Sequence, residues 1–152
     1  MNALLDDPLA VANVLIVDDN KGDVILTREA LVDGKLNVKL EAASDGQDAL
    51  NYLRSEAGRN PESIRPDVIL LDLNMPRMDG HEFLATIKED ESLKTIPAVV
   101  LTTSDADEDI LKSYKLQAAC FVTKPVDFAQ FQKIVNSLSN FWFTVVRLPG
   151  SA

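Results

Sequence analysis

The sequence of 152 residues has little cysteine and histidine and no long apolar run. Cys120 is its only cysteine, which excludes an internal disulfide and favours a reducing, cytoplasmic location. No uninterrupted apolar segment reaches the roughly 18 residues that a membrane-spanning helix needs. The first segment, "MNALLDDPLAVA", also lacks the basic region of a signal peptide. We therefore expect residues 1–12 to form a short N-terminal arm.

Basic residues are scarce as well. Lys and Arg number 15 against 24 Asp and Glu, which gives a formal net charge of −9. This balance argues against nucleic acid as a direct partner, because duplex binding depends on basic side chains that neutralise phosphates. It is compatible with a bound cation or a basic protein partner, and equally with a charge that only keeps the protein in solution.

Short apolar runs alternate with amphipathic stretches along the chain. The apolar runs predict strands over 13–17, 38–44, 67–73, 97–103 and 119–124. The amphipathic stretches predict helices over 23–34, 45–58, 80–91, 105–117 and from about 127 to 146. This repetition favours one α/β domain with a doubly wound, five-stranded parallel sheet, helices on both faces and the flavodoxin-like strand order 2-1-3-4-5.

Polar side chains follow the predicted strands where each one ends. The first strand ends in Asp18 and Asp19, and the third ends in Asp72. The fourth and fifth strands end in hydroxyl residues and a lysine, namely Thr102, Thr103, Ser104, Thr123 and Lys124. The carboxyl ends of parallel strands share one edge of a sheet, so we expect these groups to lie together. Any one of them alone is explained equally well as a turn or helix-capping residue.

As a set, these residues favour phosphoryl transfer. Converging carboxylates repel one another unless a cation lies among them, and oxygen ligands favour a hard ion such as Mg²⁺. A lysine and a hydroxyl at the same edge can bind the oxygens of an anion. A carboxylate can itself act as the nucleophile and form an aspartyl-phosphate.

Four separated motifs carry a resemblance to a known family. They are "IVDDN", "LLDLNMPRMDG", "VVLTTS" and "CFVTKP". Over about residues 12 to 140, the chain resembles the CheY-like receiver domains of two-component response regulators. The segments "NKGDVILTREAL" and "FWFTVVRLP" are further similar to the small response regulators of cyanobacterial phytochrome histidine kinases.

The resemblance implies roles for the acidic residues. Asp72 would accept the phosphoryl group and also bind the Mg²⁺ ion, or another divalent cation in its place. Asp19 would bind the ion directly and Asp18 mainly through water. Asn74 would contribute its backbone carbonyl.

The resemblance also implies roles around the fifth strand. Lys124 would bind the phosphoryl oxygens, and the bond from Lys124 to Pro125 would be cis, an isomer that costs little before proline. Thr102 would turn its hydroxyl to the phosphoryl group as the switch. The second switch position falls on Phe121, which lacks the hydroxyl of the tyrosine that many relatives have there.

The implied function is that of a single-domain response regulator. A histidine kinase, of the phytochrome type by the narrower resemblance, would phosphorylate Asp72, and output would follow through contact with a downstream protein that the sequence does not identify. The chain would catalyse only its own phosphorylation and dephosphorylation, and would bind neither nucleic acid nor membrane. A kinase of another type, or a place in a multistep relay, remains an alternative.

Three competing functions fit the residues less well. A phosphatase of the haloacid dehalogenase class needs a second aspartate where Asn74 stands, and has its acidic pair late in the chain. A flavodoxin-like cofactor carrier needs a phosphate-binding loop, but the acidic "DDNKGD" would repel phosphate. A degenerate receiver that acts only as an adaptor would not need the full set of site residues.

The C-terminal segment is richer in apolar residues than one helix face requires. One stripe at helical spacing is expected to face the core: Phe128, Phe131, Val135, Leu138 and Trp142. Four residues remain, namely Phe141, Phe143, Val145 and Val146. They would either fold back onto the domain or form a homodimer interface with the neighbouring strand and helix face. We accordingly divide the chain into the arm, a receiver domain over 13–140 and an apolar extension over 141–152.

Three further side chains carry expectations of their own. We expect Asp79 to cap the helix that begins at Gly80. We expect His81 to be a solvated surface residue. Cys120 is expected to pack inside the fifth strand as a small hydrophobic residue.

Overall fold

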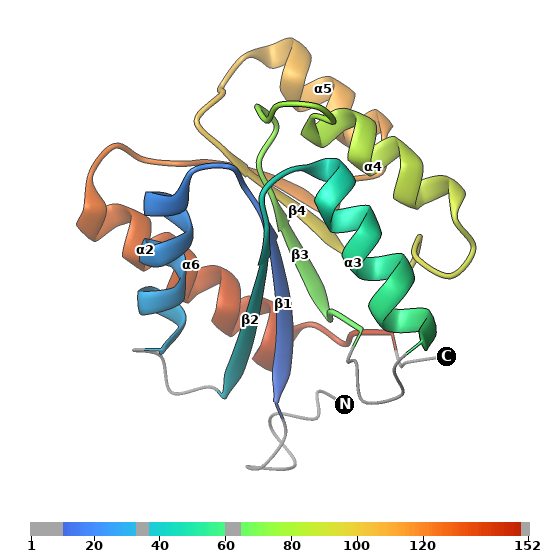
Figure 1. Cartoon of the computed structure of the whole chain (residues 1–152). Coiled ribbons are helices and arrows are strands. Elements are labelled where there is room, and N and C mark those ends of the chain that lie inside the picture. Colours follow the sequence, from blue (N-terminus) through green and yellow to red (C-terminus); the bar gives the residue numbers. More distant parts are fainter. Residues whose placement is uncertain (1–10, 33–36, 60–64, 150–152) are drawn as a thin grey trace.

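The computed structural model describes residues 11–32, 37–59 and 65–149, except for the side chains of 55–59. Its strands are β1 (Ala12–Val17), β2 (Val38–Ala43), β3 (Val68–Leu71), β4 (Ala98–Thr102) and β5 (Cys120–Thr123). Its α-helices are α2 (Lys21–Val32), α3 (Gly46–Arg59), α4 (Gly80–Glu89), α5 (Asp107–Lys115) and α6 (Phe128–Asn140). A short π-helix, η1 (Phe141–Val145), follows α6 (Figure 1).

The strands form one parallel sheet in the order β2-β1-β3-β4-β5. This confirms the predicted fold class and strand order. Every residue of β3 and β4 is buried, as expected for central strands covered on both faces. The chain first winds from β1 to β2 and then returns to the other side of β1 as β3. The point where the winding direction reverses therefore lies between β1 and β3, where ligands of such sheets bind.

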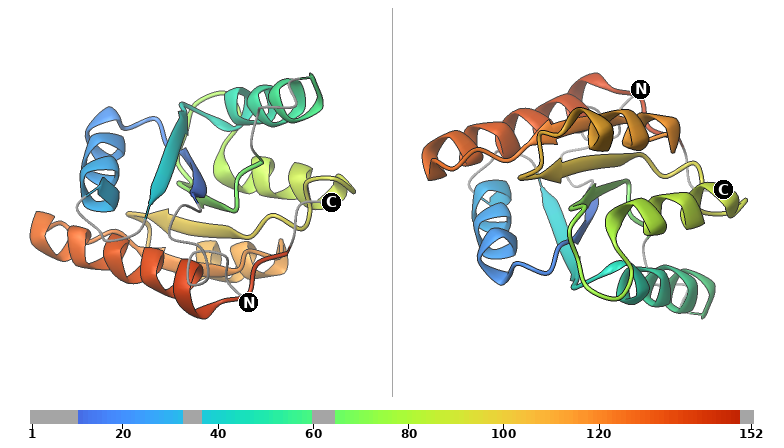
Figure 2. Two further views of the ribbon diagram at one scale, coloured as in Figure 1. Left: turned by 90° about the horizontal axis from the view of Figure 1, so that it is seen from below. Right: turned by 90° about the horizontal axis from the view of Figure 1, so that it is seen from above.

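Two helical layers cover the sheet (Figure 2). Helices α2 and α6 contact each other on one face, while α3 contacts α4 and α4 contacts α5 on the other. Each layer has its own apolar core. One contains Phe83, Leu84 and Ile87 of α4, and the other contains Phe131 and Val135 of α6. The loops that leave the carboxyl ends of the strands lie at the top edge in Figure 1.

The predicted elements agree with the structure to within a few residues. For example, α2 begins at Lys21, two residues before the predicted start, and α4 ends at Glu89, two residues before the predicted end. The end of the first predicted helix, residues 33 and 34, lies outside the described residues. Asp79 caps α4 as predicted. Its carboxylate accepts a hydrogen bond from the backbone N–H of Glu82, whose side chain in turn accepts from Asp79 N–H.

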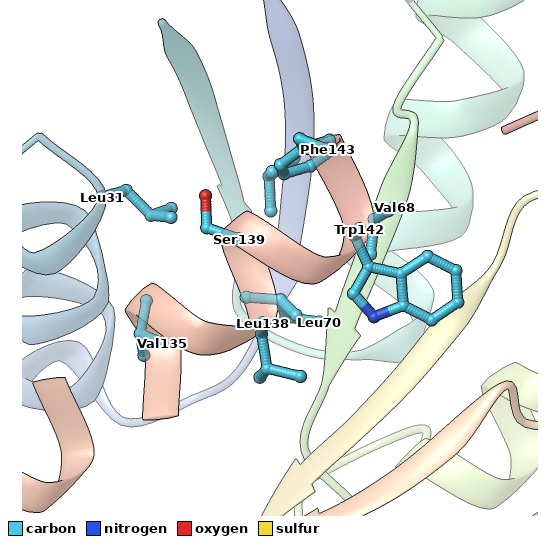
Figure 3. Close-up of a pocket in the computed structure, with 9 residues that line it drawn as sticks. Leu31, Val68, Leu70, Val135, Leu138, Ser139, Trp142 and Phe143 are labelled. Atoms are coloured by element: carbon cyan, nitrogen blue, oxygen red, sulfur yellow. The ribbon is translucent and has the colours of Figure 1, made fainter. Parts of the chain in front are cut away.

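The C-terminal helix differs from the prediction in the face that it buries. Phe128 is 49% exposed, so its prediction as a core residue was wrong, whereas Phe143, expected outside the stripe, is only 3% exposed. Phe128 is the first residue of α6, at the end of the helix far from η1. Phe143 lies within η1, in which Val146 N–H donates to the Phe141 carbonyl five residues earlier. A π-turn is wider than an α-turn, so it rotates Phe143 toward the sheet. Figure 3 shows Phe143 with Leu31 of α2 and Leu70 of β3 around a small apolar crevice.

Gly80 allows the loop between β3 and α4 to close on itself. Gly80 N–H donates to the Leu73 carbonyl over 2.9 Å, and a Cβ atom at position 80 would lie 2.3 Å from the Asp72 carbonyl oxygen. Both contacts are with backbone, which cannot move aside locally. The loop after Asp72 therefore depends on glycine at this position.

We expect Gly80→Ala to destabilise the fold by about 3 kcal/mol, at the upper end of overpacking effects. Gly22→Ala is the matched control, since a Cβ there would meet only the side-chain oxygen of Asn20, at 3.2 Å. It should change stability by less than about 1 kcal/mol. Denaturant unfolding of both variants measures the difference, and equal stabilities would contradict the steric argument.

Candidate functional site

The residues that directly follow strands β1, β3 and β5 lie at one edge of the sheet. Asp18 follows β1, and its N–H donates to the Ala43 carbonyl of β2 over 3.0 Å. Asp72 follows β3, and its N–H donates to the Val17 carbonyl of β1 over 2.9 Å. Lys124 follows β5, with its N–H bonded to the Thr102 carbonyl of β4 over 2.6 Å. The sheet's own hydrogen bonds thus hold the backbone beneath each functional side chain.

The ammonium group of Lys124 lies among three carboxylates. Its Nζ is 2.7 Å from Asp18 Oδ2, 2.8 Å from Asp23 Oδ2 and 3.4 Å from Asp72 Oδ2. The Lys124 side chain is only 4% exposed, and that of Asp18 only 2%. Asp72 also accepts a hydrogen bond on its other oxygen, Oδ1, from Leu73 N–H at 2.7 Å. One oxygen of Asp72 therefore faces the lysine and the other is fixed by backbone.

Burial and charge shift two pKa values at this site. Burial raises the pKa of Asp18 to about 6, although the hydrogen bonds from Lys124 and Asn20 N–H oppose the shift. Burial alone would lower the pKa of Lys124, but its hydrogen bonds to Asp18 and Asp23 outweigh this and raise it. Lys124 therefore stays charged over the physiological range.

One oxygen each of Asp18, Asp19 and Asp72 lies within 4.8 Å of the others. Oxygens at such separations can share one small cation after slight adjustment, and an all-oxygen set suits Mg²⁺ or Mn²⁺. Asp19 and Asn74 line an open, mainly polar pocket of about 490 Å³ beside this cluster. The residues present therefore fit a hard divalent ion with access from solvent.

The loop that carries Asn74 is fastened to the start of α3. Arg77 pairs with the buried carboxylate of Asp45, which also accepts the Asp48 N–H as the cap of α3. These contacts hold the pKa of Asp45 below its ordinary value. Gly46 N–H donates to the Met78 carbonyl over 3.0 Å. The loop thus has two attachments to α3 that are independent of the site.

The predicted switch residues lie beside this edge on β4 and β5. Thr102 is fully buried, while the neighbouring Thr103 is exposed. Phe121 is half-buried against the core, and its N–H donates to the hydroxyl of Tyr114 on α5 over 3.2 Å. Thr102 thus ends β4 and Phe121 lies in β5, and their switching role remains a prediction.

Two predictions near the site need correction. The bond from Lys124 to Pro125 is trans, not cis. The trans isomer is favoured by about 0.5–1 kcal/mol for an ordinary X-Pro bond. His81 is half-buried and not fully solvated, since its Nε2 lies 3.0 Å from the hydroxyl of the buried Ser113 on α5. Its place at the start of α4 directs the ring toward the neighbouring helix.

Cys120 behaves largely as predicted. It is half-buried and packs against the core formed by α2 and α6. Burial raises the pKa of its thiol, which disfavours the reactive thiolate.

The sequence reasoning missed one site residue, Asp23. It lies in the first turn of α2 and contacts a lysine 101 residues away, so no local pattern indicates the pairing. The available signal was its position in the first turn of the helix that follows Asp18 and Asp19, which places it near the same edge of the sheet.

The comparisons with known proteins agree with this geometry. Residues 14–136 match the model of the response regulator receiver domain. The chain is 40% identical over 138 residues to response regulator Rcp1 of Synechocystis sp. (strain ATCC 27184 / PCC 6803 / Kazusa), covering 91% of this chain and 93% of Rcp1. The chain therefore belongs to the receiver-domain response regulators, which are two-component signalling proteins.

Two solved structures are also similar to this chain. The phosphorylated cyanobacterial phytochrome response regulator RcpA has a TM-score of 0.86 and 42% identity, covering 93% of this chain and all of that one. The Mn²⁺-bound form of Rcp1 has a TM-score of 0.83 and 40% identity, over 91% of this chain and 99% of that one. The chain is thus similar to phytochrome response regulators along most of its length. Within the part of the chain that the structure describes, no helix is long and apolar enough to cross a membrane.

Proposed function

We propose that this protein accepts a phosphoryl group on Asp72 from a histidine kinase, in a reaction that requires Mg²⁺ or a similar divalent ion. The observation that carries the proposal is the single cluster formed by Asp18, Asp19, Asp72 and Lys124 at the reversal point of the sheet. Two features of the relatives support it: RcpA is described as phosphorylated and Rcp1 as Mn²⁺-bound.

The proposed chemistry follows from the different surroundings of the two Asp72 carboxylate oxygens. Oδ1 is held by the Leu73 N–H, while Oδ2 points toward the ammonium of Lys124. Attack by a carboxylate oxygen forms an O–P bond as the P–N bond of the phosphohistidine breaks. Lys124 then binds an oxygen of the transferred group and balances part of its charge.

A bound divalent ion would supply further positive charge for the phosphoryl oxygens. Asp18, Asp19 and Asp72 would hold it, together with the backbone carbonyl of Asn74. The attachments of the loop to Asp45 and Gly46 would keep that carbonyl in position.

The similarity to Rcp1 and RcpA supports a phytochrome-type photoreceptor kinase as the donor. A different sensor kinase, or a place within a multistep relay, is the alternative. In either case the output would be contact with another protein in the cytoplasm, with no direct role for nucleic acid or membrane. We also propose the division of the chain that the sequence predicts, with an N-terminal arm over 1–12, a receiver domain over 13–140 and an apolar extension over 141–152.

The metal requirement gives the first test. We expect acetyl phosphate, a small phosphoryl donor, to label the protein in the presence of Mg²⁺ and not in excess chelator. The reason is that the site's uncompensated carboxylates repel an incoming phosphate in the absence of the ion. Intact-protein mass spectrometry measures the added phosphoryl group. Labelling at the same rate in chelator would contradict the metal requirement.

We also propose that the protein forms a homodimer through the face that β5, α6 and η1 form. Large apolar side chains are exposed there, including Phe128, Phe141 and Val145. Analytical ultracentrifugation should show a dimer at micromolar concentration, and Phe141→Asp should yield a monomer. Val32→Asp is the matched control, because Val32 is also exposed but lies on α2. A wild-type monomer well above micromolar concentration would overturn this proposal.

A further inference from the structure

We propose that Asp23 regulates the reactivity of the site by competing with the phosphoryl group for Lys124. The inference rests on the proposed phosphorylation of Asp72 and adds a positioning residue to it. Asp23 lies outside the strand ends and outside the group of carboxylates that could share a cation. Its contact with Lys124 therefore needs an explanation other than metal binding.

The hydrogen-bonding capacity of Lys124 is the first argument. An ammonium group has three N–H donors and no acceptor. Lys124 has three carboxylate partners, at 2.7 Å (Asp18), 2.8 Å (Asp23) and 3.4 Å (Asp72). All its donors are therefore in use before any phosphoryl group arrives. The long 3.4 Å contact with Asp72 can pass to the phosphoryl group that this residue accepts, but a contact of ordinary hydrogen-bond length requires Lys124 to move away from Asp18 or Asp23.

The exposure of the three carboxylates indicates which partner is given up. The side chain of Asp18 is 2% exposed and that of Asp72 is 12% exposed, whereas that of Asp23 is 25% exposed. A carboxylate left without its cation costs least where water can reach it. Asp18 would also be retained by the metal ion, while Asp23 lies outside the group of described carboxylates that could share that ion. Asp23 is thus the exchangeable ligand of Lys124.

Two consequences follow for the resting protein. Asp23 draws the ammonium group toward α2, so that its shortest contacts are with Asp18 and Asp23 and not with Asp72. The Asp23 charge also repels the anionic donor. Phosphorylation would release Asp23 and so break the ion pair that joins α2 to the end of β5.

The substitution Asp23→Asn isolates this effect. It removes the charge but retains the backbone contacts at this position, in which Asp23 N–H donates to Asn20 Oδ1 and the Asp23 carbonyl accepts from Thr27 Oγ1. Glu29→Gln is the matched control, since it removes one negative charge from an exposed position on the same helix. Asp23→Glu keeps the charge and serves as the conservative variant.

The experiment measures kcat/KM for phosphorylation of the full chain by acetyl phosphate, at Mg²⁺ concentrations that saturate each variant. In this reaction an Asp72 oxygen bonds to phosphorus and acetate leaves. We expect Asp23→Asn to raise kcat/KM by about tenfold, the scale of one charge removed near the reacting atoms. Glu29→Gln should stay within about twofold of wild type, as expected for an exposed charge, and Asp23→Glu should stay closer to wild type than to Asp23→Asn.

Thermal unfolding of each variant accompanies the kinetics. An unchanged or lower kcat/KM for Asp23→Asn with an unchanged melting temperature would overturn the proposal. Asp23 would then have no effect on the rate, or would hold Lys124 in its productive position. An equal gain in Glu29→Gln would also overturn it, since the effect would then be one of net charge.

If Asp23→Asn fails to fold, the conservative variant Asp23→Glu decides. A kcat/KM for Asp23→Glu that departs from wild type by tenfold or more would count against the proposal, and a value close to wild type would support it. Failure of acetyl phosphate to label even the wild type would instead contradict the proposed function itself.

Discussion

Asp72→Asn is expected to abolish phosphorylation by both acetyl phosphate and a phosphorylated histidine kinase. An amide nitrogen or oxygen is a far poorer nucleophile toward phosphorus than a carboxylate oxygen, so the acyl phosphate does not form. The substitution preserves the shape of the side chain, and its amide oxygen can still accept the Leu73 N–H that Asp72 Oδ1 accepts now. The backbone of the site should therefore remain in place.

Loss of folding is not expected to explain the loss of labelling in this variant. Asp72→Asn removes one negative charge from a cluster with an excess of carboxylates, so the metal-free protein should be no less stable than wild type. Asp127→Asn is the matched control: Asp127 caps α6 from an exposed position, and asparagine caps helices equally well. It should be labelled like wild type. Labelling of Asp72→Asn at the wild-type rate would contradict the assignment of Asp72.

Lys124→Ala is expected to affect both stability and reactivity. Removal of one partner from a buried ion pair costs about 3–5 kcal/mol, and here it leaves three carboxylates without their shared cation. Phosphorylation should slow by about 100-fold, the usual effect of losing one group that stabilises developing negative charge. Mg²⁺ should stabilise this variant more than wild type, because the metal would then be the only cation in the cluster.

A comparison of Lys124→Ala with a matched variant of an exposed lysine, Lys133→Ala, tests the role assigned to Lys124. Lys133→Ala, at an exposed position on α6, should change stability by less than about 0.5 kcal/mol. Denaturant unfolding with and without Mg²⁺ gives both stabilities, and acetyl phosphate labelling gives the rates. If Lys124→Ala unfolds and reacts like Lys133→Ala, the central position assigned to Lys124 is wrong.

The sequence predicts the sheet well because its central strands are buried on both faces. Continuous apolar runs such as 68–71 and 98–101 are long enough for strands and too short for helices. The residues that follow them then converge because parallel strands share a carboxyl edge. The positions of Asp18, Asp72 and Lys124 could therefore be inferred from their neighbours in sequence.

Other features depend on contacts that local patterns do not report. The π-turn at Phe141–Val145 changes which aromatic side chains face the core, and a regular 3.6-residue period cannot anticipate it. The contact of Asp23 with Lys124 and that of His81 with Ser113 each join distant segments. Such pairings follow from how the helices pack and not from the residues beside them.

The most direct test of the central claim locates the phosphoryl group in the chain. Borohydride reduces an aspartyl-phosphate to homoserine, which peptide mass spectrometry identifies by position. After reaction with a phosphorylated histidine kinase and Mg²⁺, we expect homoserine at position 72 and at no other aspartate. Homoserine at a different aspartate, or an acid-stable phosphate on a serine or threonine with residue 72 unmodified, would contradict the account.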